Sequence, residues 1–450
     1  MPSFSQPPSS ADPKIAALRL SPGSESCFTL KPLPGEGIRE MFARLALALK
    51  DSATTPLKLM VFGSVSAWPA AEEAMRLAFG KIDWPVTWVE GAACNGDPIA
   101  GIQAFAFTAG RVDRITLNGR VVGSVFEDGA IRHCLLGGLG PQSVSAPRPD
   151  QFRQTLANLE TALSQAGFTL DDVVRTWFYL DDLLSWYAPF NQARTQAYSG
   201  IKFRSGSLPA STGISAKNPD GAALVAGALA LQPLNSTAQG AGQDSSRSPL
   251  SPRLRGESRR EDPPEFSCAP CAHEPDAPVF SLPSTNLWRG GLGRGGSSQV
   301  HGQGFPKVVL HPTAQISEVH SPLQCPATAY GSSFSRAMEI FSLHGRRLLI
   351  SGTASISPAG QTLWPGDLRQ QIHHTMEVIE AILTSRGFEF PDITHAIAYF
   401  KDPAGLSEFE SWCAVRNLHS LPVISTHSGI CRPDLLFELE ADAWQPAPAI

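Results

Sequence analysis

Two acidic residues near the C-terminus have the spacing of a pair that could carry acid–base chemistry. Glu438 and Glu440 lie in the segment LFELEA, which is typical of a β-strand, so both side chains are expected on one face of it. Two carboxylates on a packed strand are unfavourable unless one is neutral, paired or turned towards a cleft. A cleft would raise the pKa of one carboxyl group and suit it to proton transfer. The alternative is two solvated acids on an exposed sheet face.

A cysteine and an arginine lie just before this strand. Cys431 precedes Glu438 by seven residues, and its thiol is either a reactive group or a small buried apolar one. Arg432 could bind a carboxylate through two hydrogen bonds, and a surface ion pair is its ordinary alternative. His427, in the preceding loop, is an acid–base candidate or else an ordinary loop histidine.

The segment SGTAS, residues 351–355, ends a predicted hairpin in the same part of the chain. Its glycine, Gly352, would let a ligand approach the backbone, and Thr353 and Ser355 offer hydroxyl groups for hydrogen bonds. A plain strand end followed by a turn is the alternative. We count all three residues among the candidates for substrate binding.

Further residues of this region complete the set of candidates. Arg336 enters the hairpin and is a second candidate for binding an anion. Tyr399 and Glu440 are also counted as substrate-binding candidates. Asp367 stands at the start of the next predicted helix, where Asp is a favourable N-cap, and we assign it a structural role.

The composition excludes several classes of protein. The chain has 450 residues, with 36 Lys+Arg against 41 Asp+Glu, and its net charge of -5 does not suit a nucleic-acid binder. No apolar run reaches the roughly 18–20 residues that would span a bilayer. The Pro- and Ser-rich N-terminus lacks the apolar core of a secretory signal. The eight cysteines are irregularly spaced, which favours a reducing cytoplasm over a disulfide framework.

Residues 236–307 differ from the rest of the chain. They are rich in Pro, Arg, Gly and Ser and have no apolar periodicity, so we predict a disordered insertion. Cys268 and Cys271 have CxxC spacing, but no second pair with zinc-site spacing accompanies them. The Arg-rich run at 247–260 is interpreted as a solvated charge run.

Residues 151–182 and 371–402 are two copies of one pattern, related by an offset of 220. In each copy an amphipathic helix ends at a glycine, Gly167 in the earlier copy, and a strand follows it. A hairpin pattern precedes the helix, at residues 121–136 and 338–351. A second helix and a closing strand complete a β-β-α-β-α-β unit. The fold class is therefore α+β, with helices packed on one face of a mixed sheet.

The N-terminal part indicates a degenerate third copy. Residues 84–107 run parallel to residues 208–231, but no hairpin pattern precedes the expected helices. We divide the chain into a disordered N-terminus (1–27), a partial unit (28–110), a unit without a catalytic carboxylate (111–235), the insertion (236–307) and a unit with the candidate site (308–450).

The closing strands distinguish the copies. Only the last copy has carboxylates there, because the matching segments are VAGA at residues 225–228 and IAGI at residues 99–102. We therefore expect one site in each chain, around Glu438, Cys431 and the SGTAS segment. The other two copies are expected to be scaffold.

These features together resemble the RidA/YjgF family, which is also called endoribonuclease L-PSP. The resemblance rests on the β-β-α-β-α-β unit, the SGTAS segment, the helix that ends in Gly-Phe, and the closing FELEADA. It covers roughly residues 111–233 and 320–445, and more weakly 28–110. It implies a chorismate-mutase-like fold in tandem, an assembly that is usually trimeric, and ligand clefts between neighbouring units. Members of the family include deaminases of reactive enamines and imines.

Two branches of the family imply different chemistry. The deaminases use an arginine in the closing region together with a glutamate on the last strand. Glu438 matches that glutamate, but the arginine position falls on Ser211 and Ile424. The segments SGTASI and CRPDLL also resemble the chorismatase branch, which cleaves the enolpyruvyl ether of chorismate. A cysteine and a glutamate of that branch match Cys431 and Glu438.

Three functions remain open at this point. The first is an enzyme that acts on a small carboxylated enol ether, enamine or imine through Glu438, without metal or cofactor. No motif of an NTPase, a dinucleotide-dependent dehydrogenase, a zinc protease or an α/β-hydrolase competes with it. The alternative is a non-catalytic metabolite-binding or interaction protein. Ribonuclease activity, which the older family name suggests, is disfavoured by the acidic composition. We expect a cytoplasmic homotrimer that binds a carboxylated metabolite and neither nucleic acid nor membranes.

Overall fold

The computed structural model describes residues 15–19, 25–108, 110–234 and 314–447. The insertion predicted at residues 236–307, with Cys268 and Cys271, lies outside these described residues. Among the described helices, none combines the length and the apolar character that crossing a bilayer requires.

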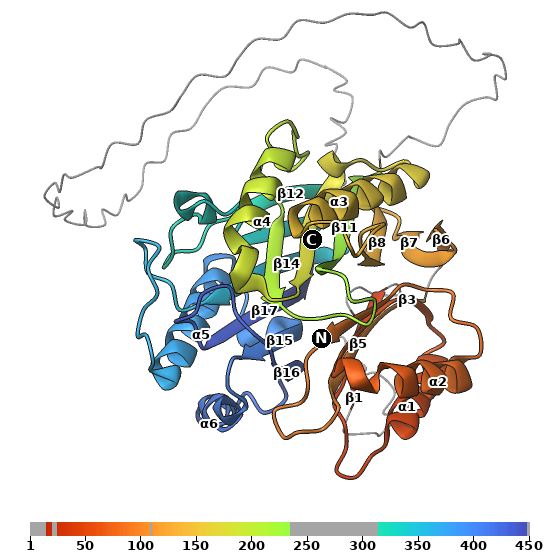
Figure 1. The fold of residues 1–450 in the computed structure, drawn as a ribbon, viewed down its shortest axis with the longest axis horizontal. Coiled ribbons are helices and arrows are strands. Elements are labelled where there is room, and N and C mark those ends of the chain that lie inside the picture. The colour runs from red at the N-terminus through yellow and green to blue at the C-terminus, as the bar shows by residue number, and fades with distance from the viewer. Residues whose placement is uncertain (1–14, 20–24, 109, 235–313, 448–450) are drawn as a thin grey trace, which may run out of the picture. The chain divides into compact units, whose positions relative to one another are not determined.

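Three mixed sheets organise the described residues (Figure 1), and we name the units that contain them first, second and third. In spatial order, the first sheet contains β1 (Ile15–Arg19), β2 (Glu25–Leu30), β5 (Ile99–Phe107), β3 (Thr55–Gly63) and β4 (Val86–Glu90). The second contains β10 (Ala210–Ser215), β9 (Val173–Leu180), β11 (Leu224–Pro233), β8 (Ile131–Leu139), β7 (Arg120–Glu127) and β6 (Asp113–Leu117). The third contains β12 (Ala314–Val319), β13 (Ala337–Ser342), β14 (Gly345–Ala354), β17 (Phe437–Pro446), β15 (Ile393–Phe400) and β16 (Val423–His427).

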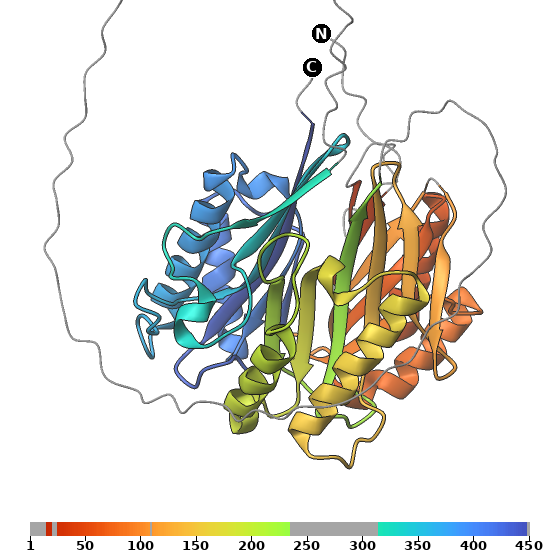
Figure 2. The same cartoon turned by 90° about the horizontal axis from the view of Figure 1, so that it is seen from above.

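The helices of each unit cover one face of its own sheet (Figure 2). The first unit has α1 (Ile38–Asp51), η1 (Val65–Ala67) and α2 (Trp68–Phe79). The second has α3 (Arg148–Gln165), η2 (Leu170–Asp172) and α4 (Leu183–Tyr198). The third has η3 (Ala327–Tyr330), α5 (Leu368–Ser385), η4 (Phe390–Asp392), η5 (Pro403–Gly405) and α6 (Leu406–Val415).

The closing strand is central in every sheet. Strand β17 pairs antiparallel with β14 on one side and β15 on the other, and β11 pairs in the same way with β8 and β9. In each unit the strand that follows the second helix pairs in parallel with the strand that precedes that helix, as β16 does with β15. The predicted fold class, tandem α+β units with helices on one face of a mixed sheet, is confirmed.

Local sequence explains the repeated turns. In the hairpin between β7 and β8, the Asp128 carboxylate accepts hydrogen bonds from the N–H groups of Ala130 (2.8 Å) and Ile131 (2.7 Å). Gly129, which follows Asp128 in this turn, has a φ of +92°, a backbone conformation that residues with a side chain rarely adopt. The left-handed helix end predicted at Gly167 is also present, with a φ of +71°.

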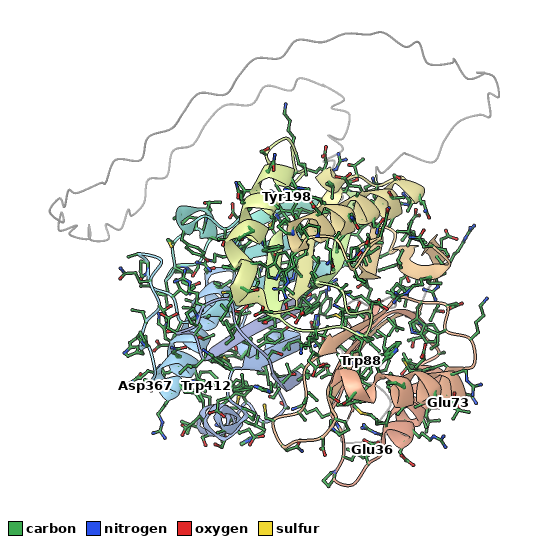
Figure 3. The ribbon with its side chains drawn as sticks, viewed as in Figure 1. Glu36, Glu73, Trp88, Tyr198, Asp367 and Trp412 are labelled. Atoms are coloured by element: carbon green, nitrogen blue, oxygen red, sulfur yellow. The ribbon has the colours of Figure 1, made fainter. Side chains whose placement is uncertain are left out.

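The start of α5 follows the sequence prediction as well. The Asp367 carboxylate accepts a hydrogen bond of 3.0 Å from the N–H of Gln370, which satisfies one free donor of the first helical turn (Figure 3).

The predicted boundaries of the first unit are wrong. We expected disorder over residues 1–27 and no hairpin, but β1 and β2 form an antiparallel hairpin whose second strand pairs with β5. The first unit thus has the same strand order as the core of the other two. The hairpin was missed because β2 depends on pairing with β5, a strand far away in the sequence, which local composition does not reveal.

The sheets meet through the faces that their helices leave uncovered. One core cluster contains buried apolar residues of all three units, whereas three other clusters fill the space between helices and sheets. At the meeting point, the ring of Phe62 lies 6.2 Å from the rings of both Tyr179 and Tyr399, in edge-on geometry. One aromatic residue from each unit therefore joins the sheets.

A buried ion pair connects the second and third sheets. Arg175 on β9 is 1% exposed, and its Nη2 donates a hydrogen bond of 2.7 Å to Oε2 of Glu440 on β17. Thr212 donates to the same oxygen, and the Tyr399 hydroxyl donates to Oε1 at 3.1 Å. The carboxylate of Glu440 is thereby bound from both units.

Replacing Glu440 tests how much this ion pair contributes to the free energy of unfolding. Glu440→Gln should lower the free energy of unfolding by about 3–5 kcal/mol, because the buried Arg175 charge loses its partner. The matched control is Glu408→Gln, which breaks the exposed ion pair between Arg369 and Glu408 (2.9 Å) and should cost no more than about 1 kcal/mol. Urea unfolding of both variants measures the difference. Equal losses would show that the buried pair is not a major contributor.

Candidate active site

A cavity of about 200 Å³ lies between the second and third units. Strand β10 and helix α4 form one wall, and strands β14 and β17, with the loop before β17, form the other. A hydrogen bond of 2.9 Å from the Ser211 N–H to Ser351 Oγ joins the two walls. The lining residues used below are Tyr187, Phe190, Arg194, Ser211, Gly213, Tyr330, Phe334, Arg336, Gly352, Cys431, Arg432 and Glu438.

Five of the predicted site residues meet at this cavity. They are Glu438 and Cys431, predicted as catalytic, and Arg432, Arg336 and Gly352, predicted to bind substrate. They come from β17, from the loop before it, from the segment that leads into β13 and from β14. The structure therefore brings together side chains that lie up to about 100 residues apart in the sequence. Their roles stay predictions.

Thr353 and Ser355 do not line the cavity. Successive residues of a strand face opposite sides of the sheet, so Gly352 faces the cavity whereas Thr353, the next residue of β14, does not. The Ser355 hydroxyl lies 3.3 Å from Nδ1 of His374 on α5, and the Thr353 hydroxyl donates to a backbone carbonyl at 2.8 Å. The alternation along the strand thus separates residues that we had placed at one site.

Glu440 and Tyr399 also lie outside the cavity. Glu440 shares a face of β17 with Glu438, as predicted, but it is covered by the second unit and bound to Arg175 and Thr212. Tyr399 is fully buried beside it. We had counted both as substrate-binding residues, and the structure places both in the contact between sheets.

Glu438 has the electrostatic surroundings of a proton donor. Its side chain is 4% exposed, and no hydrogen bond reaches its carboxyl group from any residue that the structure describes. Burial raises the pKa of Glu438 to about 8, and the negative charge of Glu440 adds to the rise, whereas Arg336 and Arg175 oppose it. Glu438 is therefore mainly protonated at neutral pH.

Two buried arginines provide donors for an anion. Nε of Arg336 donates to the Cys325 carbonyl (3.0 Å), and Nη2 of Arg194 donates to Asn191 (2.7 Å). Arg336 Nη2 and Arg194 Nε are buried and have no hydrogen-bond partner among the described residues. The two guanidinium groups lie 5.6 and 5.8 Å from the ring of Phe334. Free donors on buried cations favour a carboxylate ligand.

The other polar groups of the cavity are neutral or occupied. Burial raises the pKa of the Cys431 thiol to about 12, with a contribution from Glu438, and burial raises the pKa of Tyr330 to about 12. Arg432 donates to the Gly360 carbonyl (2.8 Å) and lies 5.1 Å from the ring of Tyr330. Cys431 is thus a thiol rather than a thiolate at neutral pH.

The second unit also lines the cavity, although we expected it to be scaffold. Its helix α4 brings Tyr187, Phe190 and Arg194 to the cavity. The sequence contained one indication that α4 contributes to the cavity. Arg194 follows Phe190 by four residues and precedes Tyr198 by four, so all three lie on one face of the helix. An arginine within an aromatic helix face is a candidate for a buried functional cation.

The two positions that correspond to the family arginine have different surroundings. Ser211 lines the cavity, and its hydroxyl accepts a hydrogen bond of 2.9 Å from Thr176. Ile424 is buried against Gly101 of the first unit. His427, the acid–base candidate of the loop, lines a different surface pocket.

Comparisons with known proteins identify one sequence family and several solved structures. The sequence model of the endoribonuclease L-PSP family matches residues 139–232 and 326–444. The solved structure of a chorismatase covers 94% of this chain and 100% of its own, at 17% identity and a TM-score of 0.55. Yeast Mmf1 covers 29% of this chain and 98% of its own, at 20% identity and a TM-score of 0.24. The YjgF gene product of E. coli covers 28% and 96%, at 18% identity and a TM-score of 0.23. No curated protein sequence matches the chain.

The fold and the two family matches define a tandem protein of chorismate-mutase-like units. The matched segments lie in the second and third units, the ones that form the cavity. The resemblance to the RidA/YjgF family, also called endoribonuclease L-PSP, is thus confirmed over two segments of the chain, residues 139–232 and 326–444.

The close approach at Gly352 can be tested by adding a methyl group. In Gly352→Ala the new Cβ would collide with the Glu438 carboxylate and lie 3.2 Å from Cγ2 of Thr212. We expect a loss of about 1–3 kcal/mol in the free energy of unfolding, since such overpacking forces neighbours to move. The control is Gly213→Ala, at the same cavity, where the methyl group would meet nothing within 4 Å. Urea unfolding should separate the two variants, and equal stability would contradict the close approach.

Proposed function

We propose that the cavity is the active site of an enzyme that uses Glu438 as a general acid. The substrate is a small carboxylated enol ether, enamine or imine, and no metal or cofactor takes part. The observation that carries the proposal is a neutral carboxyl group, with a pKa of about 8, in a cavity beside two arginines with free donors. A carboxylic acid kept protonated at pH 7 can give a proton to a substrate that the arginines hold.

Cleavage of an enol ether would begin with proton transfer from Glu438. The proton goes to the terminal methylene carbon, and the electron pair of the C=C bond forms the new C–H bond. Water then attacks the resulting oxocarbenium carbon, and the proton that it loses returns to the Glu438 carboxylate. The hemiketal collapses to a ketone and an alcohol, so one water is consumed and Glu438 is regenerated. For an imine, the same sequence protonates nitrogen and releases ammonia.

Cys431 would act after the first proton transfer. Its thiol is protonated, because burial raises its pKa to about 12, so it does not start the reaction as a thiolate. Once Glu438 has given up its proton, its carboxylate accepts the proton of the attacking water, so the Cys431 thiol keeps its own. In this proposal the sulfur lone pairs of Cys431 stabilise the cationic stage without forming a bond to the substrate.

Chorismate is the first substrate to test. A chorismatase is among the solved proteins with this fold, and chorismate is an enol ether with two carboxylates. Arg336 and Arg194 come from different units and offer one free donor each, which suits a ligand with two anionic groups. The cavity forms between two units of a single chain, so this proposal does not require a second chain. The trimer stays a prediction.

Non-catalytic binding of a metabolite is the second candidate function. It is favoured by Ser211, which stands in the cavity where the resemblance to the deaminases implies an arginine. A binding protein would use the same arginines to hold a carboxylated ligand, but substitution of Glu438 would then change affinity and no turnover would exist.

Substitution of the proposed acid is the direct test. Glu438→Gln keeps the size of the side chain and should reduce kcat for chorismate consumption by about 10²–10⁴-fold, the usual contribution of a general acid. Glu408→Gln, an exposed carboxyl group, is the control and should match wild type. In wild type, kcat/KM should fall as pH rises through about 8, because only protonated Glu438 is active. This limb should be absent from the residual activity of the variant.

A parallel assay with 2-aminoacrylate separates the two reaction types. Deamination that depends on Glu438, without chorismate turnover, would assign the enzyme to imine chemistry. Turnover by Glu438→Gln at the wild-type rate would show that the acid is another group. Absence of turnover of both substrates in wild type, with measurable binding, would favour the second candidate function.

The arginine contact can be tested through binding and pH dependence together. Arg336→Met keeps the apolar stem of the side chain and should raise KM at least ~10-fold, because a charge-assisted hydrogen bond to the substrate carboxylate is lost. Since Arg336 lowers the pKa of Glu438, the basic limb of kcat/KM should also move to higher pH. Arg369→Met, on the exposed surface, is the control. An unchanged KM and an unchanged limb would place Arg336 outside the site.

A further inference from the structure

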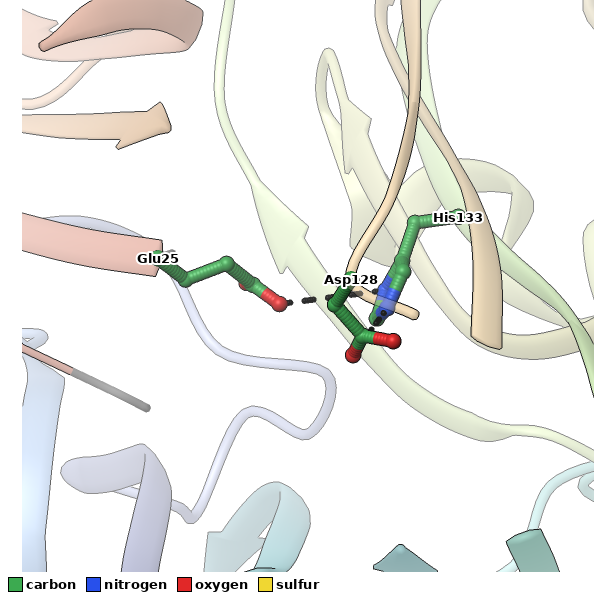
Figure 4. Close-up of side chains that lie close together, drawn as sticks. All are labelled: Glu25, Asp128 and His133. Atoms are coloured by element: carbon green, nitrogen blue, oxygen red, sulfur yellow. Dashed lines mark hydrogen bonds and ion pairs between the residues drawn. The ribbon is translucent and has the colours of Figure 1, made fainter. Parts of the chain in front are cut away.

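A second cleft, of about 40 Å³, lies where all three units meet, and no residue of the active-site cavity lines it. Glu25 on β2 belongs to the first unit, Asp128 and His133 belong to the β7–β8 hairpin of the second, and Arg347 on β14 belongs to the third. In Figure 4 the side chain of Glu25, at the start of β2, and that of Asp128, in the turn between β7 and β8, approach the imidazole ring of His133.

His133 is held with one ring nitrogen paired and the other free. Its Nε2 lies 2.9 Å from Oδ2 of Asp128, and its ring stacks on Phe126 with a centroid separation of 4.5 Å. The residue is 5% exposed, and its Nδ1 is buried without a hydrogen-bond partner among the described residues. The carboxylate oxygen Oε1 of Glu25 lies 3.8 Å from this nitrogen, beyond hydrogen-bond distance.

The hydrogen bond to Asp128 determines which ring nitrogen of His133 has no hydrogen-bond partner among the described residues. Its Oδ1 already accepts two backbone N–H groups of the turn, and its Oδ2 faces Nε2 of His133. A carboxylate only accepts hydrogen bonds, so Nε2–H is the donor in this pair, and in the neutral ring Nδ1 then has the lone pair. A histidine that donates one N–H to a carboxylate and offers the other nitrogen is the usual arrangement of a metal ligand.

Glu25 keeps one oxygen available on the His133 side. Its other oxygen, Oε2, lies 3.4 Å from Nη1 of Arg347. The Arg347 guanidinium is shared, because its Nη2 binds Asp442 more closely, at 2.9 Å. One arginine thus serves two carboxylates, and the pair formed by Glu25 and Asp128 retains negative charge that a cation can balance.

We propose that Oε1 of Glu25 and Nδ1 of His133 bind one zinc ion, with Asp128 as the residue that orients His133. The separation of 3.8 Å between the two ligand atoms is smaller than the sum of two zinc–ligand distances of about 2.0–2.2 Å, so one ion can reach both. The cleft has room for the water molecules that complete a tetrahedral site. Imidazole nitrogen and carboxylate oxygen are ligands that suit zinc.

Such a site would join the first unit to the second. Glu25 begins strand β2, the strand that links the N-terminal hairpin to the first sheet. Zinc bound to the folded chain, and not to the unfolded one, raises the melting temperature by mass action. The site is separate from the Glu438 cavity, so this proposal does not depend on the proposed function.

The test is titration of the full chain with zinc after removal of metals by a chelator. Calorimetry should show one site in wild type, and His133→Gln and Glu25→Gln should each weaken it at least ~10-fold. Asp128→Asn should weaken it by about 10–100-fold, as expected when a supporting carboxylate is lost. Cobalt in place of zinc should give visible d–d absorption in wild type and none in His133→Gln. Zinc should raise the melting temperature of wild type but not of these variants.

Two controls separate this site from adventitious binding. His373→Gln removes an exposed His373–Glu377 pair of 3.2 Å, and a Cys268→Ser, Cys271→Ser double variant removes the CxxC spacing. Both should bind zinc like wild type. The proposal is overturned if wild type binds no zinc, if His133→Gln binds it equally well, or if only a control variant loses it. Circular dichroism of each variant confirms that the fold is retained, and Glu25→Gln gives a second reading if His133→Gln is unfolded.

Discussion

The ion pair between Arg175 and Glu440 is the interaction on which the rest of the structure depends. Both partners lie away from water, and a buried charge is tolerated only when its partner and hydrogen bonds are in place. Thr212 and Tyr399 complete the binding of the carboxylate, so the second and third sheets meet in one register. The cavity beside this contact follows from it, because its two walls belong to the two sheets that the pair connects.

The same contact affects the protonation of Glu438. Glu438 and Glu440 lie two residues apart on one face of β17, yet only Glu440 has a cationic hydrogen-bond partner. Burial is the main reason that the pKa of Glu438 is raised, and the charge of Glu440 adds to it. The carboxylate of Glu440, which binds Arg175, therefore helps to keep Glu438 protonated.

Lys58 of the first unit is also buried near Glu440. Burial lowers the pKa of Lys58 to about 7, although the negative charge of Glu440 opposes the change.

A single chain with three units has interfaces that differ from one another. In an assembly of identical subunits every cleft has the same residues, whereas here each meeting point has its own. The contact between the second and third units contains Glu438 and the two buried arginines. The place where all three units meet contains Glu25 and His133 instead. One cavity therefore contains a buried carboxyl group and two buried arginines, whereas the other meeting point has a different set of side chains.

Much of the fold could be predicted, because its signals are local. The repeat, the β7–β8 hairpin with its Asp128-Gly129 turn, the helix end at Gly167 and the Asp367 cap all depend on neighbours within a few residues. The first hairpin could not be predicted in this way, since β2 is held by β5. Five of the nine predicted site residues line the cavity, and the others are excluded by strand alternation or by the covering second unit.

The amino-acid sequence by itself determined the type of unit, its repetition and the placement of two carboxylates on one face of the last strand. These properties follow from apolar periodicity and turn chemistry, which act over a few residues. Only the tertiary structure decided that Glu438 is the neutral acid, that Glu440 is the partner of Arg175, and that Arg194 shares the cavity. The physical reason is that burial and charge depend on groups that approach from another unit, and no local pattern records that approach.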